Sequence, residues 1–433
     1  MGDNKILCSV EPWDSILGVN RPNGTSRTWY YEEKGTPEEL YTLTKDIILN
    51  GTQQDVVVNS TLFHSLENLE KVEIHEIGDR KHLYIIRVQN HMFFEKNLNI
   101  GFRPISPKVL VDVKEGRALI VIECTAEGTY FKHAGTELTV IDRWREKQEL
   151  PPYSVHVISG NLLAGQIAQD NQLKIHAYGV STFERSFPIP QEIKQNIDKN
   201  IEYKPIDSQN LFLSYNRAQR THRGFLVAML NEYNLLKRGK ISYQLSNINF
   251  DNINPSLYNK QKWLLLKNKG PQYIDNDQVN NLADTLPIEH YEQTFISLVT
   301  ETTVNSRCIF FSEKIFKPIA VGHPFILLGN PFSLKKLKEM GYRTFDNWID
   351  ESYDNITDDF ARTIAIVKEI EKLKTLSEDQ LKAMRVEMNE VLTHNKKVFY
   401  SHPSVQSTNR FYIHIQNEIE KIWEILNQGK PLI

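Results

Sequence analysis

The sequence contains very little cysteine. Its 433 residues include only Cys8, Cys124 and Cys308. So small and odd a set excludes a disulfide framework, and the chain has no C-x-x-C pair that could form a zinc knuckle. Sparse cysteine is typical of proteins in a reducing compartment. We therefore expect a cytoplasmic protein.

A charge excess of one sign is also lacking. The chain has 51 Lys and Arg against 54 Asp and Glu, which leaves a formal charge of −3. A chain this balanced is not attracted as a whole to a polyanion or an anionic membrane, so any basic site must be local.

Long hydrophobic runs are absent as well. No segment approaches the ~20 uncharged residues that span a bilayer. The N-terminus reaches Glu11 and Pro12 before any apolar stretch attains signal-peptide length. The sequence therefore predicts no membrane span.

The length favours more than one domain. Single cores stop growing at roughly 250–300 residues, so a chain of 433 residues is expected to form two domains. A polar stretch at 186–210 contains three prolines and separates two halves. We predict one domain over 1–195, a second over 196–405, and a C-terminal helix within 406–433 that packs across the domains.

Both halves alternate short apolar runs with helical patterns. This order is typical of an α/β fold in which a parallel sheet is covered on both faces and ligands bind beyond the carboxyl ends of the strands. The predicted strands are 5–10, 55–59, 82–88, 108–113, 118–125, 153–159 and 174–179 in the first half, and 211–215, 240–245, 294–300 and 324–329 in the second.

The first candidate site follows the strand at 211–215. Asn216 ends the strand, and Arg217, Arg220 and Arg223 follow at three-residue steps into a predicted helix. Arginines on one helical face, close to unpaired N–H groups at a helix N-terminus, can hold phosphate oxygens. A solvated cationic face paired with surface carboxylates is the alternative.

The second candidate site is Ser312-Glu313-Lys314, which opens a predicted helix. Ser312 is expected to cap this helix, which places Lys314 in the first turn. A cation is disfavoured at the positive end of a helix dipole, and a bound anion would reverse that penalty. Ordinary exposure of Glu313 and Lys314 is the other interpretation.

The second segment resembles a known family. Glu301, Ser312-Glu313-Lys314-Ile315-Phe316-Lys317-Pro318 and Pro324…Gly329 together resemble the C-terminal motif of the α-1,3-fucosyltransferases. The segment is also similar to bacterial and phage glycosyltransferase-like proteins in which Gly-Phe/Tyr-x-Thr-Phe and Asp-Glu-Ser-Tyr-Asp stretches follow. Those stretches are matched here by 341–345 and 350–354, and the resemblance covers about residues 210–360.

The resemblance implies a GT-B-like fold, in which two Rossmann-like domains face each other across a cleft. The N-terminal domain would then bind the acceptor and the C-terminal domain the nucleotide sugar. By motif position, Lys314 and Arg217 would contact the diphosphate and Glu313 the ribose hydroxyls. The donor-binding set that we expect is Asn216, Arg217, Arg220, Arg223, Glu301, Ser312, Glu313 and Lys314.

Two departures limit what the resemblance implies. Phe310-Phe311 stands where the family has a Tyr-Val pair, and Thr300-Glu301-Thr302 replaces a Phe-Glu-Asn stretch. The resemblance therefore specifies neither the nucleotide base nor the sugar, and the expected activity is that of a hexosyl- or pentosyltransferase.

Fixed cations favour a reaction without a metal. A departing diphosphate must be stabilised by a divalent metal or by fixed positive charges, and Arg217 with Lys314 could supply the latter. We expect no metal and no cofactor beyond the nucleotide sugar. Asp275-Asn276-Asp277 is the one D-x-D pattern that could instead hold a metal, although such triplets are common in loops.

The acceptor requires a general base from the first domain. Glu127 follows the predicted strand 118–125 and precedes Gly128, which permits close approach, whereas Glu11 and Asp14 follow the first strand. We favour Glu127 and keep Glu11 and Asp14 as alternatives.

The sequence leaves the acceptor and the partners open. A glycan hydroxyl is the expected acceptor, and an inverting displacement is the expected mechanism. The alternatives are a phage-type transferase acting on a hydroxymethylated base in DNA and a non-catalytic protein that binds nucleotide sugars. The sequence does not indicate the oligomeric state.

Overall fold

The chain forms two compact α/β units. The structure is a computed structural model, and it describes residues 5–10, 69–87, 105–125, 137–182, 187, 189–206, 211–216, 218–251, 253–274, 285–304, 307–402 and 413–428. Unit 1 comprises Met1–Thr182 and Asn409–Ile433, and unit 2 comprises Phe183–Thr408. The divisions predicted from the sequence are at 195/196 and 405/406.

Unit 1 is built on a parallel sheet. Its described strands follow the order β2-β1-β3-β4-β5-β6, and every printed pairing is parallel. The strands are β1 (Ile6–Val10), β2 (Leu69–Glu73), β3 (His82–Arg87), β4 (Ala118–Cys124), β5 (Val155–Ser159) and β6 (His176–Gly179).

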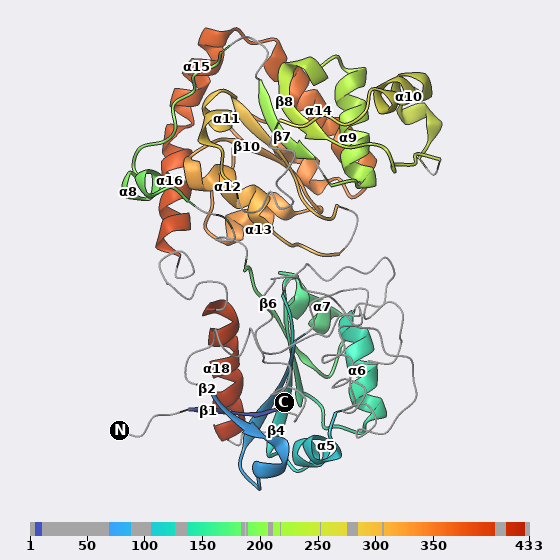
Figure 1. Ribbon diagram of the computed structural model, residues 1–433, viewed down its shortest axis with the longest axis vertical. Helices are drawn as coiled ribbons and strands as arrows, with labels where there is room; N and C mark the ends of the chain where they lie inside the picture. Colours follow the sequence, from blue (N-terminus) through green and yellow to red (C-terminus); the bar gives the residue numbers. More distant parts are fainter. Residues whose placement is uncertain are drawn as a thin grey trace, which may run out of the picture. The chain divides into compact units, whose positions relative to one another are not determined.

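Helices cover both faces of this sheet (Figure 1). On one face, α5 (Pro107–Lys114), α6 (Glu137–Lys147) and α7 (Ala164–Asp170) share a core with alternate residues of β4 and β5. On the other face, α18 (Ile413–Gln428) packs on β1, β3 and β4. Because both faces are covered, β4 and β5 are buried along their whole length.

The expected strand at 108–113 is wrong, because this segment is α5. Ser106 caps the helix, its side chain accepting a hydrogen bond from the backbone N–H of Lys108, and Pro107 takes the first helical position. Val109 and Val113 lie one turn apart and are buried. The start signal and this spacing override the strand preference of three valines.

Unit 2 is also built on a parallel sheet, with the order β10-β9-β7-β8 among the described strands. These strands are β7 (Phe212–Asn216), β8 (Gly239–Tyr243), β9 (Ile296–Thr300) and β10 (Phe325–Leu328). The α/β fold class with two parallel-sheet units, as expected for a GT-B-like chain, is confirmed.

The helices of unit 2 form two groups around this sheet. The first contains α9 (Thr221–Glu232) with α10 (Lys260–Asn268) and α14 (Asp359–Lys374), each of which packs on α9. The second contains α11 (Ile288–Glu292), α12 (Glu313–Val321) and α16 (Asn389–Ser401). The described part of unit 2 further includes α8 (Gln191–Gln195), α13 (Ser333–Glu339) and α15 (Glu378–Glu387).

The order of the strands reverses within unit 2. From β7 the chain crosses to β8 on one side, and it later returns to place β9 on the other side of β7 before continuing outward to β10. Right-handed crossovers running in opposite directions put α9 and α12 on opposite faces of the sheet. The carboxyl ends of β7 and β9 therefore form a topological switch point, where ligands of open α/β sheets usually bind.

Within the described ranges, none of the helices combines the length and the apolar character that crossing a bilayer requires.

Candidate functional site

The switch point joins the ends of β7 and β9 through polar side chains. Thr300 at the end of β9 donates from its Oγ1 to Oδ1 of Asn216 at the end of β7, over 2.7 Å. Asn216 in turn donates to Oγ of Ser214 at 2.8 Å, and both residues are buried. Asn216 thus fixes the strand ends against each other, and its amide is engaged within the protein.

Glu301, the residue after β9, connects this edge to α12. Its carboxylate accepts the backbone N–H of Ser312 at 3.3 Å and the Ser312 hydroxyl at 2.6 Å. Glu301 is 2% exposed, and burial raises the pKa of its carboxyl while the Lys314 ammonium opposes that rise. The carboxylate therefore binds the N-cap residue of α12, a position that an external anion could otherwise take.

The start of α9 approaches the same point from the other face of the sheet. His222 hydrogen-bonds through Nε2 to the Glu301 carbonyl at 3.0 Å. Burial, reinforced by the Arg223 charge, lowers the pKa of His222 to about 3. The ring is therefore neutral at physiological pH, and because its partner is a carbonyl, Nε2 carries the proton.

Arg223 is a buried cation of the site. Its Nη2 donates to the carbonyl oxygens of Thr300 and Glu301, both at 3.3 Å, and its Nη1 donates to Ala218 at 3.4 Å. Burial, and next the Arg220 charge, lower the pKa of Arg223 to about 10, so it stays charged at neutral pH. Its Nε is buried and has no hydrogen-bond partner among the described residues.

Ser312 caps α12, as the sequence predicted. Its Oγ accepts from the backbone N–H of Lys314 at 3.4 Å and from Lys314 Nζ at 3.0 Å. Lys314 Nζ also lies 2.9 Å from Glu313 Oε1, and the side chains of Glu313 and Lys314 are 12% and 25% exposed. The side chains of these two residues are therefore partly accessible to solvent.

The carboxylate beside Lys314 weakens the expectation that a lysine in the first turn of α12 indicates a bound anion. Burial acts to raise the pKa of Glu313, but the Lys314 ammonium, the Lys317 charge and a backbone hydrogen bond together outweigh burial, and the net shift is downward. Glu313 is therefore ionised beside Lys314, and it offsets the unfavourable position of that cation at a helix N-terminus. The location of Lys314 alone does not require a bound anion.

The charges of the whole cluster still favour an anion. Glu313 interacts electrostatically with Lys314 and Lys317, and Arg223 interacts with Glu301 and Glu313. Three cations thus face two carboxylates in a largely buried setting. The surplus is positive at the edge of the sheet where a ligand would enter.

The other predicted residues divide into two groups. Arg220 is exposed and occupies the N-cap position of α9 without capping it through its side chain. The predicted face shared by Arg220 and Arg223 is wrong, because α9 begins only at Thr221 and the two side chains meet different surroundings. Arg217, Glu127, Glu11, Asp14 and the triplet 275–277 lie outside the described residues.

Sequence reasoning missed His222 and the connecting role of Glu301. His222 gave no signal, because a lone histidine at a helix start fits many environments. Glu301 follows a buried strand directly, and a carboxylate at that position was the signal available.

Two segments that carry the resemblance have structural roles. The Asp354 carboxylate accepts the backbone N–H groups of Leu334 and Lys335 at 3.0 and 3.1 Å and so caps α13. The Glu351 carboxylate accepts the Thr344 hydroxyl and the Phe345 N–H. The 341–345 and 350–354 stretches therefore bind each other.

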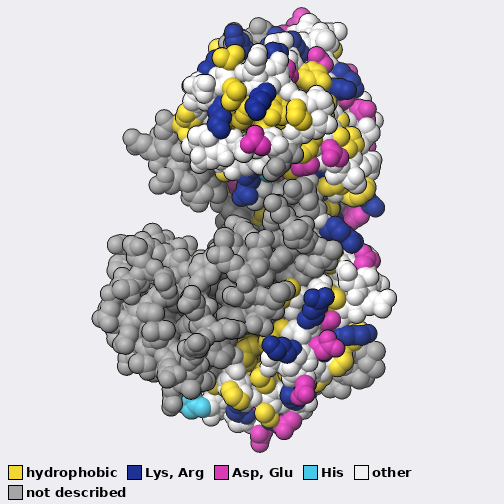
Figure 2. Space-filling view, turned by 90° about the vertical axis from the view of Figure 1, so that its right-hand side faces the viewer, with side chains coloured by type: hydrophobic (Ala, Val, Ile, Leu, Met, Phe, Trp, Pro, Cys, Tyr) yellow, Lys and Arg dark blue, Asp and Glu magenta, His cyan; other side chains and the backbone are white. Residues whose placement is uncertain are grey.

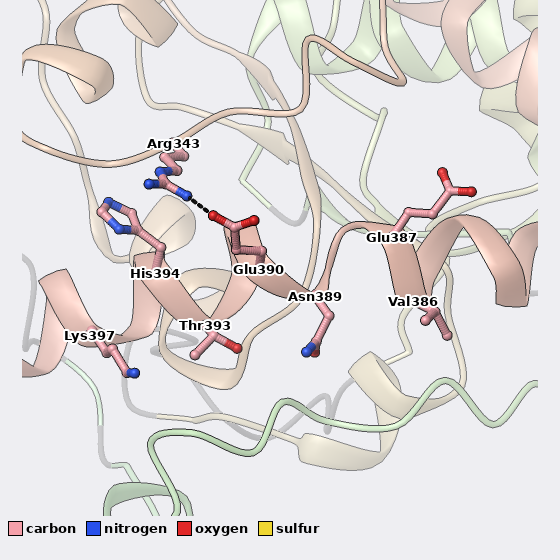
Figure 3. Close-up of a pocket in the computed structure, with 8 residues that line it drawn as sticks. All are labelled: Arg343, Val386, Glu387, Asn389, Glu390, Thr393, His394 and Lys397. Carbon is pink, nitrogen blue, oxygen red and sulfur yellow. Dashed lines mark hydrogen bonds and ion pairs between the residues drawn. The ribbon is translucent and has the colours of Figure 1, made fainter.

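A surface pocket of about 590 Å³ lies elsewhere in unit 2, at the junction of α15 and α16 (Figure 3). The Arg343 guanidinium points to the Glu390 carboxylate 2.7 Å away, and His394 bonds the Gly341 carbonyl at 2.8 Å. These groups are paired within the protein. The lining residues are Arg343, Val386, Glu387, Asn389, Glu390, Thr393, His394 and Lys397.

The described part of the chain has no group of three or more His, Cys, Asp or Glu side chains placed to hold a metal ion.

Comparison with known proteins gives little. No protein-family model matches the sequence, and no curated protein matches it. Among solved structures, the chain is similar to a glycosyltransferase from Rickettsia africae ESF-5, with 13% sequence identity and a TM-score of 0.42. That similarity covers 96% of this chain and 99% of the other.

Proposed function

We propose that the protein is a glycosyltransferase that moves a sugar from a nucleotide-diphosphate donor to a hydroxyl acceptor, most simply on a glycan. The observation that carries the proposal is the meeting of α9 and α12 at the switch point of unit 2, with Arg223 and Lys314 beside the ends of β7 and β9. The resemblance over 210–360 supports the same assignment.

The proposed reaction is an inverting displacement. The acceptor oxygen attacks the anomeric carbon, the bond from that carbon to the diphosphate oxygen breaks, and the diphosphate leaves with the electron pair. A general base accepts the acceptor's proton. The negative charge that develops on the diphosphate has to be stabilised, and preorganised cations do this without reorganisation.

We propose distinct roles for the site residues. Lys314 and Arg217 would contact the diphosphate and Glu313 the ribose hydroxyls, with no metal required. Glu301 and Asn216 support the site from within, because their polar atoms bind Ser312, Ser214 and Thr300. Arg223 would add positive charge to the site from the protein interior, while its hydrogen bonds fix the carbonyl groups at the end of β9.

The base is proposed to come from unit 1. The sheet order of that unit also reverses, between β1 and β3, so its own switch point includes the carboxyl end of β1. Glu11 and Asp14 follow β1 in the chain, whereas Glu127 follows β4. The reversal favours Glu11 and Asp14 over Glu127.

The first experiment is a thermal-shift screen with GDP-, UDP-, ADP- and CMP-sugars in the presence of EDTA. A ligand that binds only the folded state raises the melting temperature by mass action, so one nucleotide class should stabilise the protein. Lys314→Ala should abolish most of this shift and lower turnover. Lys382→Ala is the matched control, since Lys382 also pairs with a glutamate, Glu378, at 2.6 Å.

Three outcomes would contradict the proposal. A screen in which no nucleotide sugar stabilises the protein would contradict the proposed donor class. Equal thermal shifts for Lys314→Ala and Lys382→Ala would contradict the proposed role of Lys314 in donor binding. Donor binding without slow donor hydrolysis or transfer would leave a nucleotide-sugar-binding protein in place of a transferase.

A further inference from the structure

The helix α10 carries an exposed apolar pair. Leu264 and Leu265 are 45% and 65% exposed, and among the described residues they are the only two large exposed hydrophobic residues adjacent in the sequence. Helix α10 lies on the side of unit 2 that Figure 2 shows, where hydrophobic side chains lie among Lys and Arg. Single exposed leucines are ordinary, but an adjacent pair on one helix calls for a physical reason.

The core holds α10 so that this pair faces outward. Trp263 is buried and stacks on Phe250 with 4.2 Å between ring centroids, and Leu266 is also buried. Phe250 packs edge-on against Phe225 of α9. Because Trp263 and Leu266 fix the rotation of the helix, Leu264 and Leu265 cannot turn inward without breaking these contacts.

Lysines flank the apolar pair in the sequence, and the segment that contains the pair has no acidic residue. The sequence from 252 to 274 contains Lys260, Lys262, Lys267 and Lys269 and no Asp or Glu. Lys262 pairs with Glu232 of α9 at 3.1 Å, and Lys267 donates to the Ile248 carbonyl at 3.0 Å. The side chains of Lys260 and Lys269 are exposed and form no hydrogen bond or ion pair with any residue that the structure describes.

We propose that α10 docks the protein on an anionic membrane surface. An interface of acyl chains beneath anionic headgroups accepts apolar side chains and attracts lysines at the same time. The lysine stems can extend toward the headgroups while the leucines enter the acyl boundary. A protein partner would need a groove for two adjacent leucines ringed by carboxylates, which is a more specialised surface.

The docking is reversible and salt-sensitive. Two leucines bury little area compared with a membrane-spanning helix, and the lysine contribution falls as salt screens the surface charge. The inference does not depend on the proposed transfer reaction, because vesicle binding is measured without a nucleotide sugar.

The test is co-sedimentation of the full-length chain with phosphatidylcholine vesicles that contain or lack phosphatidylglycerol. We expect binding to the anionic vesicles at low salt. The double variant Leu264→Ser/Leu265→Ser should weaken it by at least about tenfold, and Lys260→Gln/Lys269→Gln by about fivefold for each lysine. Because all four side chains lie outside the core, the melting temperature should stay unchanged.

Matched controls use exposed residues elsewhere in unit 2. Ile206 and Val386 are 71% and 74% exposed, so Ile206→Ser/Val386→Ser makes the same chemical change away from α10 and should leave binding intact. Lys382→Gln serves the same purpose for charge.

The proposal is overturned if the anionic vesicles do not bind the protein at low salt, or if binding survives both α10 double variants. Binding that needs the lysines but not the leucines would indicate a polyanion or an acidic protein in place of a membrane. Self-association without lipid that Leu264→Ser/Leu265→Ser abolishes would identify a second copy of the chain as the occupant.

Discussion

At the scale of single residues, Arg220 and Arg223 show how far three positions can separate two identical side chains. Arg223 is 4% exposed and donates to three carbonyl groups, whereas Arg220 is exposed. The sequence spacing located both after the strand that ends at Asn216. It could not tell them apart, because the residue at which α9 begins decides which arginine points to β9.

This difference yields a paired prediction. Arg223→Gln should lower the free energy of unfolding by about 2–4 kcal/mol, because buried carbonyl oxygens at the end of β9 lose their donor. Arg220→Gln should change it by less than about 0.5 kcal/mol. Urea denaturation of both variants measures the effect, and equal losses would contradict the structural role of Arg223.

Among the elements, apolar runs predicted most strands: nine of the eleven predicted strands coincide with described strands, 108–113 is a helix, and 55–59 lies outside the described residues. The Ser312 cap is confirmed. The run 108–113 was misread because valines favour strands locally, while burial of Val109 and Val113 on one helical face depends on tertiary packing. The position of Glu301 after a buried strand marked it as a candidate, but its contacts with Ser312 and His222 join distant segments and could not be predicted from local sequence.

The end of α12 allows a second paired prediction. Gly322 ends the helix with φ +70°, and a Cβ there would meet the Asn200 side chain, whereas Gly341 at φ +91° has room beside Val398. Gly341→Ala should cost about 1–2 kcal/mol from backbone strain alone. Gly322→Ala should cost about 1–3 kcal/mol more than Gly341→Ala, because the new methyl group overlaps the Asn200 side chain.

Adding Asn200→Ala to Gly322→Ala separates the two effects. Removal of the Asn200 side chain should recover the part that comes from overpacking, and chemical denaturation of the single and double variants measures it. Asn200→Ala alone also loses hydrogen bonds to Asn389 and Thr393. If Gly322→Ala costs as much in the Asn200→Ala background as in the wild type, steric overlap is not the cause.

For the whole molecule, each unit buries a histidine that must stay neutral. Burial, and next the charge of His176, lower the pKa of His156 in unit 1 to about 3, and His222 of unit 2 behaves alike beside Arg223. The unfolded chain binds a proton at each histidine below about pH 6.5, whereas the folded chain does so only near pH 3. Acid therefore favours unfolding of both units.

We predict that stability falls as the pH drops from about 6.5 toward 5, by about 1.4 kcal/mol per pH unit for each such histidine. Denaturation at pH 7 and pH 5 measures the slope. His222→Asn keeps a donor for the Glu301 carbonyl but cannot take up a proton, so its slope should be smaller. A slope equal to that of the wild type would exclude His222 as a contributor.

The return of the chain to unit 1 constrains the order in which the two units can fold during synthesis. Ile415, Ile419 and Ile422 of α18 cover one face of the first sheet, yet they leave the ribosome only after all of unit 2 has been made. At roughly 5–20 residues per second, the nascent first sheet waits tens of seconds for its second layer. Unit 2, encoded later, is therefore free to complete its fold first, and until α18 arrives the apolar face that includes Cys8, Leu83 and Val121 is a natural target for a chaperone.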